Sequence, residues 1–204
     1  MMEYRIENDS LGNVNVPKEA YWGSQAERSR GLFQVSGITE HSKMIDAYVM
    51  LKKACAEVNT ELGLLEPKIG QAIVLAADEI LKGHLRDQFP VDVFHMGAGT
   101  SLNMNVNEVL ANRAEEILGG VKGQYSQVNP NNHVNFGQST NDTFPTAMRM
   151  MSRFITFQIP LENTKPIFAA HRFKIVNSGV FQFKIHAYFS KNNLNIDIFW
   201  DKIS

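Results

Sequence analysis

Three stretches of apolar residues at helical spacing, each followed by a glycine, most strongly constrain the fold of this chain. They cover about residues 42–62, 67–82 and 102–118. Proline suits the first position of a helix, as at Pro67, and glycine suits the position after its last turn, as at Gly63 and Gly83. The pattern therefore predicts three amphipathic helices.

A small β element precedes these helices. Residues 4–6 and 14–16 alternate between apolar and polar side chains, with turn residues at 8–10 and at Gly12 between them. Pro17 is expected to end the second strand because it cannot donate a ladder hydrogen bond. The fold class expected is mainly α, with this element at its start.

Composition changes sharply near residue 150. Residues 1–150 carry 13 basic and 18 acidic side chains, a balance of −5, whereas residues 151–204 carry 7 and 3, a balance of +4. The last segment also holds 8 of the 13 phenylalanines but 1 of the 14 glycines. We therefore expect one domain over 1–150 and a divergent tail over 151–204, in which residues 180–185 alternate like a strand.

Charge and composition exclude several classes of function. A net charge of −1 lacks the basic character expected of a nucleic-acid-binding protein. Cys55 is the single cysteine, which excludes an internal disulfide or a cysteine-based zinc site. No apolar run reaches the roughly 20 residues of a membrane span. The polar N-terminus does not resemble a signal peptide, so a cytoplasmic protein without nucleic-acid or membrane partners is expected.

A first polar cluster follows the turn Gly97–Gly99. Glycines allow the backbone to approach a ligand, and Thr100 lies where a new helix begins and where free N–H groups favour an anion. Asn103 and Asn107 are four residues apart and share one helix face. An ordinary helix cap with a solvated polar face accounts for the same residues.

A second polar cluster spans residues 129–135 and 138–145. Serine, threonine and asparagine favour caps, and Pro145 suits the first turn of a following helix, so Ser139, Thr140 and Asn141 should gather at that helix N-terminus. Neutral donors beside the positive end of a helix dipole can hold a carboxylate. A purely structural capping segment is the alternative.

Other polar residues have simpler interpretations. The histidines at 41, 84 and 95 lack metal-ligand partners at helical spacing, so no metal site is expected. The pairs Asp78–Glu79 and Glu115–Glu116 are interpreted as solvated helix faces, and Cys55 as a small buried side chain.

Several motifs in order resemble the N-terminal part of the class II fumarase and aspartase superfamily. The resemblance covers about residues 3–150. Its motifs are Arg5–Glu7, Val16–Pro17, Tyr21–Gly23, Asp87–Phe89, Gly97–Ser101, Asn103–Val109, Asn112–Ala114, His133–Asn135, Gln138–Asp142 and Phe144–Ala147.

The resemblance implies a homotetrameric lyase that forms fumarate from aspartate or malate without a redox cofactor. In this family a serine on a mobile loop is the general base, and polar donors hold the aci-carboxylate that forms. Thr100, Ser139, Thr140 and Asn141 match the positions that bind the C4 dicarboxylate. The helix after Pro145 would begin the long helix of the central bundle.

A second carboxylate site of fumarases matches residues Asn129, Asn131 and Asn132. Asn129 stands where histidine is usual and Asn132 where aspartate is usual. The resemblance therefore supports this second site less well.

The resemblance divides between aspartase and fumarase. Ala98, Ser101, Thr140 and residues 122–125 are aspartase-like, whereas Trp22, residues 105–107 and residues 142–145 are fumarase-like. We expect aspartate ammonia-lyase by a small margin, with class II fumarate hydratase as the alternative.

The family's Gly-Arg-Thr-His motif and its Gly-Ser-Ser loop with the catalytic serine do not occur in residues 151–204, where Pro160 and Pro166 would break a helix. We therefore expect a truncated lyase that has no catalytic residue of its own, is inactive alone and cannot form the family tetramer. A non-catalytic dicarboxylate-binding or interaction fragment, and a by-product without function, are the alternatives.

Overall fold

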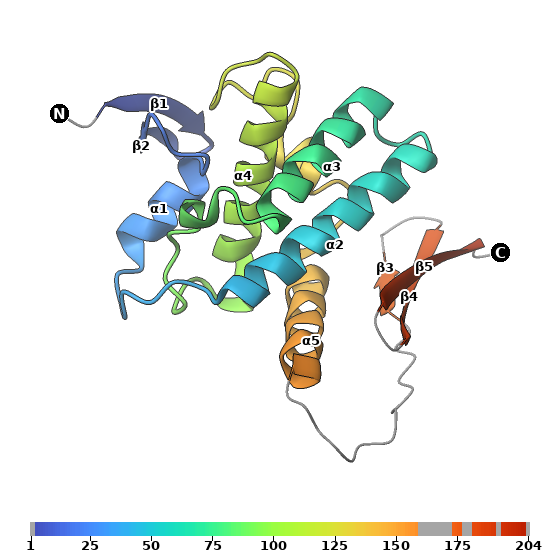
Figure 1. Ribbon diagram of the computed structural model, residues 1–204. Helices are drawn as coiled ribbons and strands as arrows, with labels where there is room; N and C mark the ends of the chain where they lie inside the picture. Colours follow the sequence, from blue (N-terminus) through green and yellow to red (C-terminus); the bar gives the residue numbers. More distant parts are fainter. Residues whose placement is uncertain (1–2, 159–172, 177–180, 191–192, 203–204) are drawn as a thin grey trace.

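The computed structural model describes residues 3–158, 173–176, 181–190 and 193–202, with side chains through residue 155 (Figure 1). The N-terminal hairpin was predicted. β1 (Tyr4–Asp9) pairs antiparallel with β2 (Gly12–Pro17), and Gly12 makes the tight turn at a φ of +108°. Glycine adopts this backbone conformation without a steric penalty.

A helix that the sequence analysis did not predict follows the hairpin. This helix, α1 (Ser24–Leu32), buries only the small residues Ser24, Ala26 and Ser29. It therefore lacks the apolar stripe on which helix prediction depends.

The three predicted central helices are confirmed. They are α2 (Ser42–Glu61), α3 (Pro67–Leu81) and α4 (Thr100–Ile117), and Pro67 occupies the first turn of α3. Helix α4 lies at the centre of the domain, where α1, α2, α3 and α5 all contact it (Figure 1). It is buried almost all round, including the polar residues Asn103, Asn105 and Asn107. A helix buried on every face needs internal partners for such side chains.

The last helix, α5 (Thr140–Gln158), starts earlier than Pro145 suggested. Pro145 was expected in the first turn, but it lies inside the helix. The Ser139–Asn141 group begins the helix instead, because the carbonyl of Ser139 already accepts from the N–H groups of Asp142 and Thr143. Pro160 and Pro166 lie outside the described residues.

Short helical turns join these elements. They are η1 (Arg86–Gln88), η2 (Gly97–Gly99) and η3 (Pro130–Val134). Of these turns, η2 lies directly before α4.

The described residues from 173 onward form a three-stranded antiparallel sheet in the order β3-β4-β5. Its strands are β3 (Phe173–Val176), β4 (Phe181–Ser190) and β5 (Asn193–Lys202). The strand expected over residues 180–185 falls in β4, apart from Val180, which lies outside the described residues. The predicted fold class is confirmed: mainly α with a small N-terminal β element.

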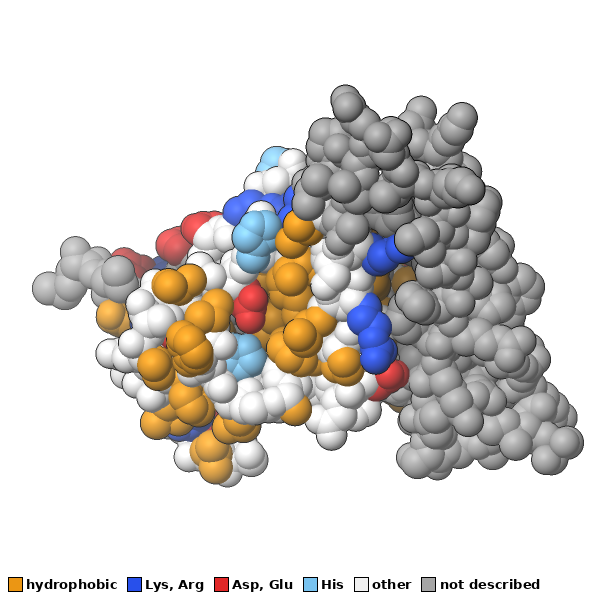
Figure 2. Space-filling model, turned by 90° about the horizontal axis from the view of Figure 1, so that it is seen from below, with side chains coloured by type: hydrophobic (Ala, Val, Ile, Leu, Met, Phe, Trp, Pro, Cys, Tyr) orange, Lys and Arg blue, Asp and Glu red, His pale blue; other side chains and the backbone are white. Residues whose placement is uncertain are grey.

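Within the described residues, no helix is long and apolar enough to cross a membrane. Apolar side chains do gather on one face of the domain, seen from below in Figure 2. Separately, five apolar residues that are each at least half exposed lie at the end of α1, in the segment after it, or in the segment before η2: Leu32, Val35, Ile38, Phe94 and Met96. Large exposed apolar patches on soluble domains often mark contact surfaces.

Candidate functional site

The two polar clusters of the sequence meet because the turn before α4 packs directly against α5. Gly99 has a φ of +75°, and a Cβ atom on it would lie 2.0 Å from the Phe144 ring. No side chain larger than hydrogen fits that gap without moving the ring. The N-termini of α4 and α5 are therefore neighbours.

The N-terminus of α5 presents the three residues predicted for carboxylate binding. Ser139 and Asn141 are exposed, and Thr140 between them is half-buried. All three lie at the positive end of a helix of 19 residues. Hydroxyl and amide groups in this position can donate to an anion without a buried countercharge.

The N-terminus of α4 contributes Thr100. Its N-cap is Gly99, so no side chain caps this end of the helix. The Thr100 hydroxyl lies 3.4 Å from the Gly97 carbonyl oxygen, a long hydrogen bond that an approaching anion can replace. Thr100 therefore lies at the start of α4, next to the Gly99 that packs against Phe144 of α5.

Below these exposed donors lies a buried polar network around the side chain of Asn135. Its Oδ1 atom accepts from Lys52 Nζ at 2.9 Å, Asn103 Nδ2 at 3.2 Å and Asn107 Nδ2 at 3.1 Å. Its Nδ2 atom donates to the Gln138 carbonyl at 3.1 Å. We call this set the Asn135 network. The shared face predicted for Asn103 and Asn107 is confirmed, and it points at Asn135.

Lys52 is fully buried and donates to Asn135 and to Gln138 Oε1, the latter at 2.8 Å. Burial lowers the pKa of Lys52 to about 7. The sequence analysis missed Lys52, because the adjacent Lys53 looks the same in sequence yet lies at the surface, 2.6 Å from Asp78. Helical phase relative to the apolar positions of α2 is the signal that could have separated them.

Asp142 is the acidic group at this end of α5. Burial raises its pKa, although Arg149 acts in the opposite direction. Its Oδ2 atom is buried and has no hydrogen-bond partner among the described residues. Its raised pKa means that Asp142 takes up a proton more readily than an exposed aspartate does.

The residues of the expected second carboxylate site lie on η3 and its cap. The Asn129 Oδ1 atom accepts from the backbone N–H groups of Asn131 at 2.9 Å and Asn132 at 3.0 Å. The Asn129 side chain therefore already uses the N–H groups that would face an anion. The structure does not bring these residues to the N-terminus of α5 through any hydrogen bond in its described part.

Glu115 was interpreted as a solvated residue, and this was wrong. It is fully buried and accepts from the backbone N–H groups of Ser126, Gln127 and Val128. Burial raises its pKa, but these hydrogen bonds and that of the Ser126 hydroxyl outweigh it, and the net shift is downward. A loop that supplies several N–H groups can bury a carboxylate that spacing alone places at the surface.

Glu108 is a second buried carboxylate, and the sequence analysis did not single it out. Its oxygens accept from the backbone N–H groups of Gly23, Gln25 and Ala26 at 2.9–3.1 Å, at the N-terminus of α1. Burial raises the pKa of Glu108 to about 7, and these three hydrogen bonds limit the rise. Glu108 thus holds α1 against α4.

His41 and His95 make local hydrogen bonds. His41 accepts from the Lys43 N–H at the start of α2, and the largely buried His95 ring bonds the Met96 carbonyl oxygen. Cys55 is buried, as predicted. Among the described residues, no group of three His, Cys, Asp or Glu side chains could hold a metal ion.

Lyases of known function resemble this chain in sequence. The sequence profile of a family described as Lyase matches residues 12–157. Class II fumarate hydratase of Nitrosomonas europaea is 52% identical over 150 residues, which are 74% of this chain and 32% of that protein. Aspartate ammonia-lyase of a Bacillus species is 48% identical over 163 residues, 80% of this chain and 35% of that protein.

Solved structures agree with these relatives. The fumarate lyase:delta crystallin of Brucella melitensis is 45% identical with a TM-score of 0.74, over 76% of this chain and 35% of that one. The class II fumarase of Schistosoma mansoni is 43% identical with a TM-score of 0.70, over 73% and 32%. The chain spans about a third of the length of the curated relatives that it matches.

Proposed function

The chain belongs to the lyase family, in the fumarate lyase superfamily, and we propose that it binds a C4 dicarboxylate where the N-termini of α4 and α5 meet. The observation that supports this proposal is the packing of the turn before α4 against α5: Gly99 lies against the Phe144 ring, and Asn103 of α4 donates to Thr140 of α5. We further propose that residues 1–150 form the lyase-like domain and residues 151–204 a divergent tail.

The chemistry of the site suits one carboxylate of such a ligand. Its donors are neutral hydroxyl and amide groups at two helix N-termini, so binding does not require a buried cation in contact with the ligand. In a lyase reaction, the proton leaves the carbon next to a carboxylate, and negative charge moves onto that carboxylate. Donors fixed in advance stabilise this charge in the transition state.

We propose that this chain binds but does not turn over substrate alone. The catalytic serine loop of the family has no counterpart in its sequence. The full reaction would need that base from further polypeptide, and with it the family's tetramer. No redox cofactor is part of this proposal.

Two substrates of the class remain candidates for the complete enzyme. Ala98, Ser101 and Thr140 favour aspartate, with release of ammonia. The identity of 52% to class II fumarate hydratases, against 48% to aspartate ammonia-lyase, favours malate and release of water. Assay of fumarate formation from both compounds tests the inactivity of the chain: we expect none, and turnover of either compound would contradict the proposal and show which substrate is used.

Calorimetric titration with fumarate and succinate tests the binding proposal. We expect dissociation constants of about 1 mM for both, with acetate at least tenfold weaker because it carries one carboxylate. Absence of heat with either dicarboxylate would contradict the proposed site.

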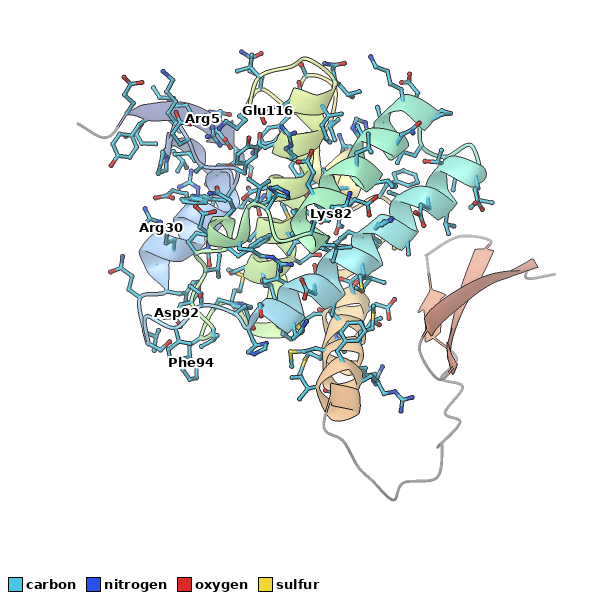
Figure 3. All side chains as sticks on the ribbon, viewed as in Figure 1. Arg5, Arg30, Lys82, Asp92, Phe94 and Glu116 are labelled. Atoms are coloured by element: carbon cyan, nitrogen blue, oxygen red, sulfur yellow. The ribbon has the colours of Figure 1, made fainter. Side chains whose placement is uncertain are left out.

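A second candidate function is assembly with a longer lyase of the family. The loops that carry Val35, Ile38 and Phe94 favour it, because Asp92 fixes them with their apolar side chains outward. Asp92 accepts from the N–H groups of Ser36, Gly37 and Phe94 at 2.8 Å. Figure 3 shows Asp92 and Phe94 together at the end of the domain opposite Arg5 and Glu116. Native mass spectrometry of a mixture with a full-length relative tests this, and exclusive homomers would contradict it.

A further inference from the structure

One hydrogen bond connects the buried Asn135 network to the exposed donors of the proposed site. The Asn103 Nδ2 atom donates to Thr140 Oγ1 at 3.1 Å as well as to Asn135 Oδ1 at 3.2 Å. Building on the proposed function, we infer that Asn103 is a positioning residue, which orients the Thr140 hydroxyl so that it donates to the carboxylate of the ligand.

The hydrogen-bond inventory of Thr140 supports this role. A hydroxyl has one proton to donate and two lone pairs that accept. Because Asn103 supplies an N–H to Thr140 Oγ1, the hydroxyl proton has to point away from Asn103. Thr140 is half-buried between exposed Ser139 and Asn141, so a ligand at this helix N-terminus can reach its hydroxyl.

The amide of Asn103 is held in one orientation by its donors. Both Nδ2 protons have acceptors, whereas its Oδ1 atom is buried and has no partner among the described residues. A flipped amide would face Thr140 and Asn135 with an oxygen and would leave both N–H groups unpaired, which costs more. In the observed orientation, Asn103 therefore donates two hydrogen bonds while its Oδ1 atom accepts none.

Asn135 fixes the other end of this link. Its Oδ1 atom accepts three donors, one of them the Lys52 amine of α2, whose hydrogen bond is stronger when the amine is charged. The network thus ties the hydroxyl at the start of α5 to both α2 and α4. The Asn103 amide supplies two N–H groups, one to each acceptor.

Asn107 provides a matched control, because it lies one helical turn away, is equally buried and donates to the same Asn135 Oδ1 atom. It has no hydrogen bond to Thr140. The Asn103→Leu and Asn107→Leu variants therefore remove the same chemistry from the network, but only the first removes the link to the site.

The experiment measures fumarate affinity by calorimetry and stability by urea unfolding. We expect N103L to weaken fumarate binding about tenfold and N107L less than twofold, with similar loss of stability in both. In the background of Thr140→Val, N103L should change the affinity less than twofold, because the hydroxyl that it orients is absent. Should a leucine variant not fold, N103S and N107S make the same comparison.

Two other results would overturn the inference in distinguishable ways. Equal weakening by N103L and N107L, or an undiminished effect of N103L in the T140V background, would show a structural role only. No fumarate binding by the unaltered chain would contradict the proposed function itself.

Discussion

Helix N-termini are used in two different ways in this domain. At α1, internal carboxylates accept the backbone N–H groups: Glu108 takes those of Gly23, Gln25 and Ala26, and Glu7 takes that of Ser24. At α4 and α5, no carboxylate accepts such a bond within the described residues. The first end is closed by the protein, and the second presents neutral donors at the surface.

The same electrostatics therefore serves stability in one place and, in our proposal, ligand binding in the other. A helix N-terminus favours a negative charge whatever its source. Where the chain supplies the charge, α1 is fixed to α4. At the N-termini of α4 and α5, where no carboxylate of the described residues accepts the N–H groups, an external carboxylate can bind. The predictions below separate the two uses.

The largest expected effect is a loss of stability at the N-terminus of α1, which Glu108 closes. Glu108→Ala leaves three buried N–H groups without an acceptor, and we expect a loss of about 3 kcal/mol in the free energy of unfolding. The exposed Glu57 of α2 gives the control, since E57A should change stability by less than about 0.5 kcal/mol. Urea unfolding measures both, and equal values would mean that Glu108 does not close α1.

The next largest effect is expected from the contact of Gly99 with Phe144, which packs the start of α4 against α5. Gly99→Ala places a methyl group against Phe144 at a positive φ, so we expect a loss of about 2 kcal/mol and of measurable fumarate binding. Gly97 has open space where a Cβ would lie. G97A should keep both properties, and calorimetry with thermal melting would reveal whether the two glycines differ.

A smaller effect separates binding from stability. Thr140→Val removes one donor, and we expect fumarate binding about tenfold weaker, equivalent to about 1.4 kcal/mol, with less than 1 kcal/mol lost in stability. Ser152→Ala, farther along α5, should leave the affinity unchanged. If T140V binds fumarate as tightly as the unaltered chain, the proposal that the N-terminus of α5 binds the ligand is contradicted.

Two buried groups should also give opposite pH dependences of stability. Because burial raises the pKa of Glu108 from 4.5 to about 7, the folded state holds more protons in that window, and stability should fall as pH rises through it. Because burial lowers the pKa of Lys52 from 10.5 to about 7, stability should rise as pH increases from 7 towards 10.5.

Urea unfolding across pH 4–10 measures these slopes. E108Q should remove the fall in stability between pH 4.5 and 7, and K52M should remove the rise above pH 7. Each variant should leave the other slope unchanged. Burial raises the pKa of Cys55 from 9.0 to about 11 and also raises that of Tyr48, so together they make stability fall from about pH 9 upward, and the rise due to Lys52 is read between pH 7 and 9. Unchanged slopes in both variants would contradict the assignment of these two groups.

Much of the fold was predictable, because α2, α3 and α4 each carry an apolar stripe and a terminal signal. The hairpin alternates clearly, but α1 buries only small residues and gave no periodic signal. The start of α5 was predicted through its polar cap, whereas Pro145 misplaced the first turn.

The residues of the proposed site could be predicted from the sequence, but the hydrogen bonds between them could not. Spacing put Asn103 and Asn107 on one face and Thr140 at a helix start. That Asn103 reaches Thr140 depends on the packing of α4 against α5, which no local pattern encodes. Buried Lys52, Glu108 and Glu115 were missed or misread, because a charged residue looks solvated until the backbone groups that surround it are known.

Residue-resolved NMR titration of the chain with fumarate tests the open helix ends most directly. We predict saturable shifts of the amide resonances of Thr100, Ser139, Thr140 and Asn141, with small changes at Gly23–Ala26, where Glu108 already occupies the N–H groups. Shifts confined to residues 129–132, or no saturable shift at the starts of α4 and α5, would contradict the account.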